Sequence, residues 1–498
     1  MKGANTMKKA TVIRILTLAI MASMLMTSCG GETGGETGGD TTEPNTETTV
    51  EETKDVSYPY EIKKLDGREF RFLNCVDDHW QGASQIIDYD SMNGETVADK
   101  VYKKNRDAEE KLGIKITVTK EAVDQLHKAV STAVMANDDI YDAVYGCVYA
   151  FGTETDGKYV LNLHDIGAIN FDDEWWNPSY AKSALIGGDR LYVAVDYMNL
   201  NGYTWTDALY FSKDLVTKYG LEMPYDLVRD GKWTLDRMAE YMKPAINLNG
   251  DESFKVNPEG RSSYGLCVQH SGGIVAISEG AGGFVVERDK DGIPSIVSNV
   301  EGAVNAFEKL AGMLSDEGSC FMYNTAEYSS LMAFVSGRGM FYQGALGNSL
   351  GDKMRSAASE YGIIPLPKFD EKQSQYYSTV SQYTLALSIP KTVADPETVG
   401  ACLDYLEWAS FTECIPVVQD ALCYKGVRDD DSIEMLDIIR KTQYTDMGVI
   451  YGWSTEFITK QSDNVYKGKL QFASDFASAK QKIEDNISKS LEEMGING

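Results

Sequence analysis

The stretch LYFSKDLVTKYGLEMPYDLVRDGKWTLDRMAEYMK, residues 209–243, carries the clearest signals for how the chain folds. It opens on an apolar strand that runs into a helix, and Gly220 marks the end of that helix. A second helix is predicted over 231–243, with Thr234 as its N-cap. A strand that passes directly into helices is typical of a layered α/β protein.

The chain before this stretch repeats the alternation of strands and helices. Strands are predicted at 68–76, 114–119 and 141–146, and helices over 96–113 and 124–137. Strands separated by single helices at this spacing predict a parallel sheet in an α/β layer.

The chain after it continues the pattern into a mostly helical C-terminus. We expect further strands at 189–197, 339–345, 361–367 and 384–390, and helices over 303–314 and 472–494. About 440 residues are available to the globular part, which is enough for two large lobes.

The N-terminus has the pattern of a secretory signal. Four basic residues precede or border the apolar run ILTLAIMASMLM (15–26), which is too short for a comfortable membrane span. The following MTSC resembles a bacterial lipobox, which implies a signal peptide over 1–28 and a lipid on Cys29 at the outer face of the cell membrane. An ordinary signal peptide with an incidental cysteine is the alternative.

Residues 29–57 contain a short GGET repeat and a Thr/Glu run with almost no apolar residue, so we expect a flexible acidic tether. The whole chain has a net charge of −28, and loss of 1–28 would remove four positive charges and no acid, leaving −32. Such acidity argues against nucleic-acid partners and anionic lipid surfaces, because both require basic patches.

The remaining cysteines and histidines show no metal-binding spacing. Seven cysteines follow Cys29, and an odd, scattered set argues against a disulfide scaffold. One bridge among Cys402, Cys414 and Cys423 stays open as an alternative to buried free thiols.

Six segments, in order along the chain, resemble one protein family. They are AEEKLGIKITV (108–118), NDDIYDAV (137–144), GDRLYVAVDY (188–197), the opening stretch, AFVSGRGMFYQGA (333–345) and YGIIPLPKFDEKQSQYYSTVSQYTLALSIP (361–390). Together they resemble extracellular solute-binding protein family 1, the maltodextrin-binding type of ABC transporters, over most of 66–425. Ser212 departs from the family's usual asparagine and Asp196 from its proline.

The resemblance implies an α/β, two-lobed periplasmic-binding-protein-like fold of type II, with a sheet flanked by helices in each discontinuous lobe and a hinge between the lobes. Lobe 1 would comprise 58–195 and 338–392, and lobe 2 would comprise 196–337 and 393–498. A carbohydrate, expected to be an oligosaccharide, would bind between the lobes, and the lobes would close around it. The closed form would deliver the sugar to the transmembrane subunits of an ABC permease.

The resemblance further implies a monomer without catalytic activity or cofactor. Residues 246–260 resemble a degraded calcium loop of one subgroup, in which Asn247, Asn249 and Asp251 keep the spacing and Glu252 replaces the glycine. A calcium site and a polar loop are both open for this segment, and we predict no metal ligand.

Sugar sites need aromatic faces for C–H patches, and amides or carboxylates for hydroxyls. We selected such side chains at strand ends, where α/β clefts form, on the crossing near 195 and at positions that resemble the family's contact residues. The predicted ligand-binding residues are Asp78, Trp80, Tyr145, Tyr149, Trp175, Tyr197, Asn199, Tyr203, Gln269, Tyr342, Gln343, Tyr383 and Trp453. Core packing is the alternative for each aromatic among them.

The segment FDDEWWNPSY (171–180) joins three carboxylates to two tryptophans. One tryptophan is expected in the core and Trp175 at the cleft rim, with core positions for both as the alternative. A catalytic reading is disfavoured because the chain lacks G-x-S-x-G, HExxH and P-loop motifs. Two alternative functions stay open. A protein of the same fold could bind a peptide, polyamine or other small solute, or the protein could be a surface sensor or adhesin without transport.

Overall fold

The computed structural model describes residues 57–76, 86–148, 157–254, 258–297, 300–323, 325, 328–423 and 430–496. The predicted signal peptide, the lipidation site Cys29 and all but the last residue of the predicted tether lie outside these ranges. Residues 56–498 form one compact unit. Within the described ranges, no helix combines the length and the apolar character needed to cross a bilayer.

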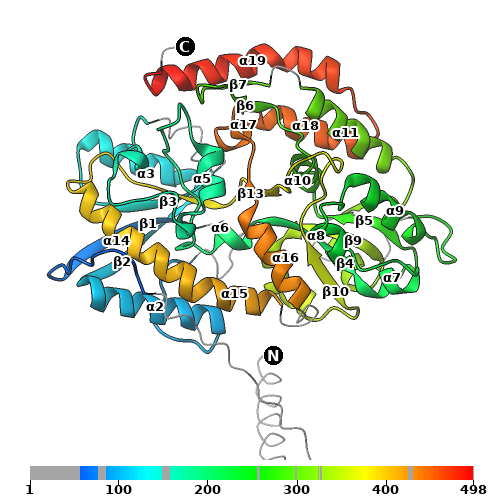
Figure 1. Cartoon of the computed structure of the whole chain (residues 1–498), viewed down its shortest axis with the longest axis horizontal. Coiled ribbons are helices and arrows are strands. Elements are labelled where there is room, and N and C mark those ends of the chain that lie inside the picture. The colour runs from blue at the N-terminus through cyan, green and yellow to red at the C-terminus, as the bar shows by residue number, and fades with distance from the viewer. Residues whose placement is uncertain are drawn as a thin grey trace, which may run out of the picture. The chain divides into compact units, whose positions relative to one another are not determined.

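Two sheets organise this unit (Figure 1). The first has the strand order β12 (Leu385–Ser388), β3 (Ala143–Cys147), β1 (Arg68–Val76), β2 (Ile114–Ala122). The second has the order β10 (Tyr361–Ile364), β4 (Asp207–Ser212), β9 (Gly339–Ala345), β5 (Tyr264–Val268), β8 (Cys320–Met322). Two small ribbons pair β11 (Ser378–Thr379) with β13 (Gln443–Tyr444), and β6 (Val286–Arg288) with β7 (Pro294–Ile296).

Both sheets are mixed. In the first sheet β1 runs parallel to β2 and β3, as the sequence predicted, and β12 returns antiparallel to β3. In the second sheet β5 lies parallel to β8 and β9, whereas β4 lies antiparallel to β9 and β10.

Helices surround both sheets. The longer ones are α2 (Thr96–Leu112), α3 (Val123–Ala136), α9 (Leu235–Ala245), α10 (Gly272–Gly280), α11 (Glu301–Met313), α14 (Pro396–Ala409), α15 (Ile415–Leu422), α16 (Asp430–Lys441), α18 (Thr455–Tyr466) and α19 (Phe472–Glu493). Shorter ones are α5 (Pro178–Ala184), α6 (Asn201–Thr204), α7 (Lys213–Lys218), α8 (Tyr225–Arg229), α12 (Ser330–Val335), α13 (Asp352–Arg355) and α17 (Met447–Ile450). Single helical turns are η3 (Leu163–Asp165), η4 (Glu174–Trp176) and η5 (Leu346–Leu350), and the π-helical turn η6 (Ser410–Cys414) joins α14 to α15.

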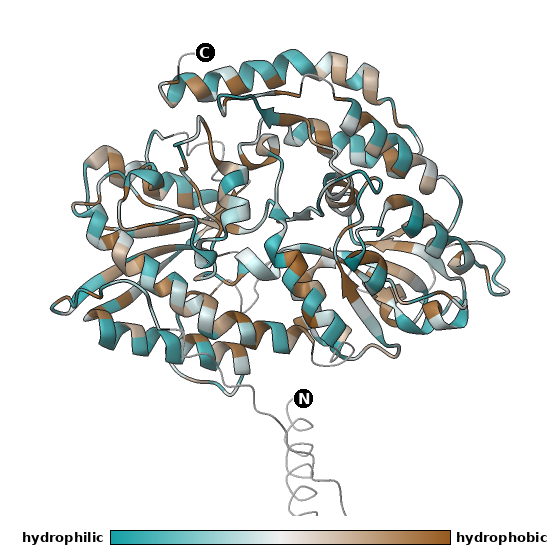
Figure 2. Cartoon of the chain, viewed as in Figure 1, coloured by the Kyte–Doolittle hydropathy of each residue, from teal (hydrophilic) through white to brown (hydrophobic). Residues whose placement is uncertain are grey.

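The hydropathy pattern explains this layering. In Figure 2 hydrophobic and hydrophilic residues alternate along strands β1 and β2 of the first sheet and along helices such as α2 and α19. Phe70 and Phe72 of β1 and Phe341 of β9 are fully buried. Alternating or continuous apolar residues in strands and amphipathic helices bury their apolar surfaces against each other, which stabilises such a fold.

Strand pairing corrects part of the predicted lobe assignment. The segment 338–392 was assigned to lobe 1, but β9 and β10 pair with β4 and β5 in the second sheet, and only β12 joins the first. Helices α14 and α15, assigned to lobe 2, pack against α2 beside the first sheet. The error arises because pairing partners far apart in sequence leave no local signal. The other lobe boundaries stay a prediction.

The predicted strand over 189–197 does not form. Within this segment only Arg190 and Ala194 make isolated bridges, with Ile186 and Leu387 respectively. Residues 194–207 then run as a buried crossing from the first sheet to the second, and we call this segment the crossing.

A buried carboxylate holds the beginning of the crossing. Glu407 of α14 accepts hydrogen bonds from the backbone N–H groups of Tyr197 and Met198, at 2.9 and 2.7 Å. The Tyr145 hydroxyl lies 2.9 Å from Asp196 Oδ2 and 3.1 Å from Glu407 Oε1, and donates to these acids. Burial raises the pKa of both acids, and the neighbouring Asp196 charge raises that of Glu407 further.

A buried amide holds the end of the crossing. Gln443 donates to the Gly202 carbonyl and to the Thr206 hydroxyl, both at 2.6 Å, and its Oε1 accepts from Asn177 and Tyr197. Backbone polar groups in a core need such partners. The crossing is therefore fixed at both ends by side chains from the C-terminal part of the chain.

Candidate functional site: a cavity beside the crossing

A cavity of about 960 Å³ lies where the crossing meets the second sheet. Its lining comes from the second sheet, from the loop after β5, from α10, and from residues 379–383, which lead into β12 of the first sheet. This volume is near the upper end of the range typical for small-ligand pockets. The cavity is therefore the candidate binding site.

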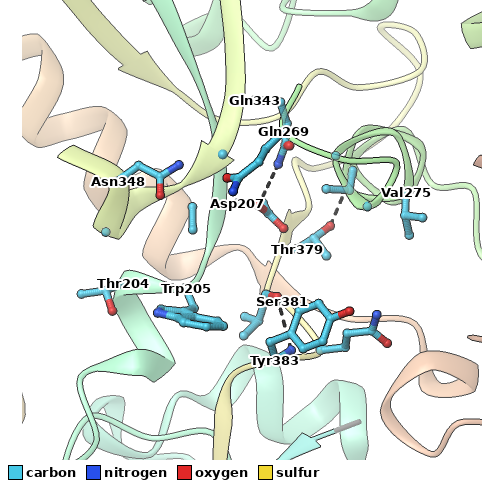
Figure 3. A pocket seen from close by; sticks show the side chains of 18 of the residues that line it. Thr204, Trp205, Asp207, Gln269, Val275, Gln343, Asn348, Thr379, Ser381 and Tyr383 are labelled. Carbon is cyan, nitrogen blue, oxygen red and sulfur yellow. Dashed lines mark hydrogen bonds between the residues drawn. The ribbon is translucent and has the colours of Figure 1, made fainter. Parts of the chain in front are cut away.

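Two aromatic side chains form one side of the cavity. Trp205 lies near the end of the crossing and Tyr383 precedes β12, and in Figure 3 both rings face the space from the same side. Their backbones are connected, because Ser381 donates its N–H to the Trp205 carbonyl at 3.0 Å and Thr206 forms a bridge with Val380. Both rings are partly exposed, which leaves area for a ligand to cover.

Polar side chains of the second sheet stand opposite the rings. Gln343 of β9 donates a hydrogen bond to Asp207 Oδ1 of β4 at 2.7 Å (Figure 3). Leu209 is the direct cross-strand partner of Gln343, so Asp207, two residues earlier, shares the same face. Gln269, after β5, and Asn348, in η5, add amides to this lining.

Gly273 allows the first turn of α10 to approach Gln343. A Cβ added at this glycine would lie 2.2 Å from Gln343 Oε1. A side chain there would displace the Gln343 amide from Asp207, so the absence of a Cβ is part of the geometry of the site.

The buried carboxyl groups at the polar side of the cavity and close to it have raised pKa values, so they are difficult to ionise. Burial raises the pKa of Asp207 to about 7, and the hydrogen bond from Gln343 acts in the opposite direction. Burial also raises the pKa of Glu279 on α10 well above its usual range, and the charges of Asp446 and Asp207 raise it further. Burial raises the pKa of Asp446, which caps α17, to about 6.

Three of the predicted ligand-binding residues line the cavity: Gln269, Gln343 and Tyr383. Three others, Asp78, Trp80 and Tyr149, lie outside the described residues. Whether the lining residues contact a ligand stays a prediction.

Four predicted residues are instead buried around the crossing. Tyr145 and Tyr197 bind the carboxylate and amide that hold the crossing, as described above. The Asn199 side chain accepts the backbone N–H of Asn201, and Tyr203 accepts a hydrogen bond from Gln419. These side chains form hydrogen bonds in and around a buried chain segment, which explains why polar residues occur on an otherwise apolar crossing.

Strand alternation separates Tyr342 from Gln343. Successive side chains of β9 point to opposite faces of the sheet, so Tyr342 is buried in the core while Gln343 lines the cavity. The Tyr342 hydroxyl accepts a hydrogen bond from Asn348 at 2.9 Å. Trp453 is also buried, stacked on Tyr451, and its indole N–H donates to Ser490.

The tryptophans of FDDEWWNPSY form a structural cluster. Trp175 and Trp176 both donate their indole N–H to Asp404 Oδ1, at 2.9 and 2.5 Å, and Tyr58 donates to Oδ2 at 2.6 Å. Trp176 is fully buried and Trp175 partly buried. Trp176 occupies the expected core position, Trp175 is partly buried beside it with Asp404 as their shared acceptor, and neither lines the cavity.

The loop at 246–254 uses its polar side chains internally. Asp251 accepts the backbone N–H groups of Arg261 and Ser262, and Asn247 accepts that of Asn249. No group of three or more His, Cys, Asp or Glu side chains in the described ranges is placed to hold a metal ion. Cys402, Cys414 and Cys423 are free thiols.

Comparison with known protein families and with curated proteins gives no match for this chain. Many solved structures are similar to it, including these two. One is the GacH receptor of Streptomyces glaucescens GLA.O, determined unliganded and with acarbose and an acarbose homolog, with a TM-score of 0.51 and 14% identity. The other is the ABC substrate-binding protein Lmo0181 from Listeria monocytogenes in complex with cycloalternan, with a TM-score of 0.51 and 13% identity. Both matches cover 87% of this chain and 100% of the other.

At these identities the similarity shows the fold. The chain has the two-lobed α/β fold of periplasmic binding proteins, and the predicted fold class is confirmed. The cavity beside the crossing is lined both by the second sheet and by residues 379–383, which lead into β12 of the first sheet.

The raised pKa of Asp207 predicts a pH-dependent stability. A carboxyl whose pKa rises from 3.8 to about 7 on folding binds its proton more tightly in the folded state. Its contribution to stability is therefore complete below about pH 4 and is lost as the pH rises through about 7. The Asp207→Asn variant has no carboxyl group to ionise at this position, so it should not show this loss of stability.

Urea unfolding at pH 5 and pH 8 measures the effect. The free energy of unfolding of Asp207→Asn, relative to the unmodified chain, should be higher at pH 8 than at pH 5. An equal difference at both pH values would contradict the proposed titration of Asp207.

Proposed function

We propose that this chain is an extracytoplasmic solute-binding protein that captures a carbohydrate, most simply an oligosaccharide, and delivers it to an ABC permease. The observation that carries this proposal is the pairing of Trp205 and Tyr383 with the amides of Gln343 and Gln269 across one cavity. A sugar ring offers apolar C–H faces to aromatic rings and hydroxyl groups to amides, so both sides of the cavity match its chemistry.

Two further observations support a sugar. The cavity volume is sufficient for a ligand larger than a small metabolite. The two similar structures hold acarbose, an acarbose homolog or cycloalternan. The role is binding and not catalysis, and closing of the two sheet-centred units around the ligand would present one closed form to the permease.

A lipid on Cys29, followed by the acidic tether, would hold the binding unit at the outer face of the membrane. The support for this part is the signal-like N-terminus and the composition of 29–57. A sensor or adhesin without transport would use the same anchor, and a peptide or other small solute is the alternative ligand.

Removing the aromatic side of the cavity should weaken sugar binding. Trp205→Ala and Tyr383→Ala are each expected to reduce affinity roughly tenfold to a hundredfold, because each removes a stacking surface. Isothermal titration with the best oligosaccharide from a thermal-shift screen measures this loss. The matched control is Tyr60→Ala, an exposed tyrosine outside the cavity lining, which should bind as before.

Unchanged affinity in both cavity variants would contradict the site. A screen in which only peptides raise the melting temperature would contradict a carbohydrate ligand.

Anchoring is tested separately by Cys29→Ser. This variant cannot accept the lipid, so the protein should move from the membrane fraction to the soluble or secreted fraction and lose incorporation of labelled fatty acid. A variant that stays in the membrane fraction to the same extent would contradict the lipid anchor while leaving the ligand site untouched.

A further inference from the structure

Two carboxyl groups, Asp207 and Glu279, line the same cavity. Asp207 begins β4, and Glu279 lies near the end of α10 with only 2% of its surface exposed. Asp207 is hydrogen-bonded to Gln343, and the Gln343 amide lies against the first turn of α10, the helix that carries Glu279. They form an acidic end of the cavity on the side of the second sheet.

The acidic end has unused hydrogen-bonding capacity. Within the described residues Glu279 Oε2 is buried and has no hydrogen-bond partner. Asp207 Oδ1 accepts a hydrogen bond from Gln343. Among the residues that the structure describes, no other hydrogen bond reaches the Asp207 carboxylate. A buried carboxylate oxygen without a donor is costly, so a ligand that supplies a donor gains free energy there.

The acidic end also has no positive counter-charge. Across the described ranges, neither Asp207 nor Glu279 forms an ion pair with lysine or arginine, and the nearby Asp446 adds a third acid. The only arginine in the cavity lining is Arg355, on α13. Since the chain carries a net charge of −28, its wider field favours cations as well.

A protonated amine satisfies both conditions. It supplies up to three N–H donors and one positive charge, and charge-assisted hydrogen bonds to carboxylates are about twice as strong as neutral ones. A neutral hydroxyl supplies one donor and no charge, so two acids in one cavity would each have to keep a proton. Burial raises the pKa of Asp207 to about 7 and that of Glu279 well above its usual range, so each acid resists ionisation until a cation is beside it, and a bound ammonium group favours the charged forms.

We propose that Asp207 and Glu279 form an amine subsite, at which the ligand binds through a protonated primary amine. This inference rests on the proposed function. The ligand would then be an oligosaccharide that contains an amino sugar. The aromatic side of the cavity would hold the sugar faces, and the acidic end would select the amino group.

The test is a thermal-shift and titration series on the purified full chain with four probes. These are a glucosamine trimer, an N-acetylglucosamine trimer, a glucose trimer and spermidine. Acetylation removes the charge and leaves the sugar ring, so the first two probes differ mainly at the amine. We expect the glucosamine trimer to bind at least tenfold more tightly than either neutral trimer.

Variants locate the effect. Asp207→Asn and Glu279→Gln should each reduce the preference for the amine at least tenfold, because they remove the negative charge at nearly constant shape. Asp352→Asn, an exposed acid at the start of α13 outside the cavity lining, is the matched control and should keep the preference. If a variant fails to fold, the comparison of the glucosamine trimer with the neutral trimers on the unmodified chain still tests the amine subsite.

The outcomes separate this inference from the proposed function. Equal binding of glucosamine and neutral trimers would overturn the amine subsite and leave the carbohydrate function in place. Binding of spermidine alone, lost in Asp207→Asn, would keep the amine subsite and overturn the carbohydrate function. No shift with any of the four probes would contradict both.

Discussion

The structure depends on a buried chain segment, the crossing at 194–207, whose polar backbone must find partners inside the protein. Glu407 accepts the N–H groups of Tyr197 and Met198, and Gln443 donates to Gly202 and Thr206. A buried backbone group without a partner costs about as much as a lost hydrogen bond, so these contacts fix where the segment runs. Trp205 and Asp207 stand at its end, and the crossing therefore sets the position of the cavity.

The cavity follows from ordinary packing rules applied at this point. On β4 and β9, side chains alternate between core and cavity, which separates the buried Tyr342 from Gln343 and brings Gln343 beside Asp207. Gly273 allows α10 to begin against the same amide. The aromatic rings are positioned by the bridge between Thr206 and Val380. Each functional side chain is thus held by a backbone contact, which reduces the cost of ordering it for a ligand.

Local patterns in the sequence predicted local structure well. The predicted strands at 68–76 and 339–345 coincide with β1 and β9, because apolar runs bounded by turns are local signals. The pairing of β9 with β4 and β5 was not predicted, since pairing depends on contacts between distant segments. The strand predicted at 189–197 did not form because an apolar segment can be buried with only isolated bridges and without joining a sheet.

The candidate site was predicted only in part. Gln269, Gln343 and Tyr383 line the cavity, whereas most of the selected tyrosines and tryptophans are core residues with satisfied hydroxyl or indole groups. Trp205 and Asp207 were missed because the predicted strand that follows them is almost wholly apolar, so no alternation indicates which side chains face a cavity. Glu279 carries no local signal, because its neighbours on α10 are small and apolar and only the tertiary structure buries it in the lining of the same cavity as Asp207.

The most direct measurement of the central claim is a crystal structure of the protein grown with the oligosaccharide that stabilises it best. The account predicts density for the sugar in the cavity beside the crossing, with ring faces against Trp205 and Tyr383 and polar groups near Gln343 and Asp207. Density for the sugar at another place on the protein, with this cavity filled only by water, would contradict it.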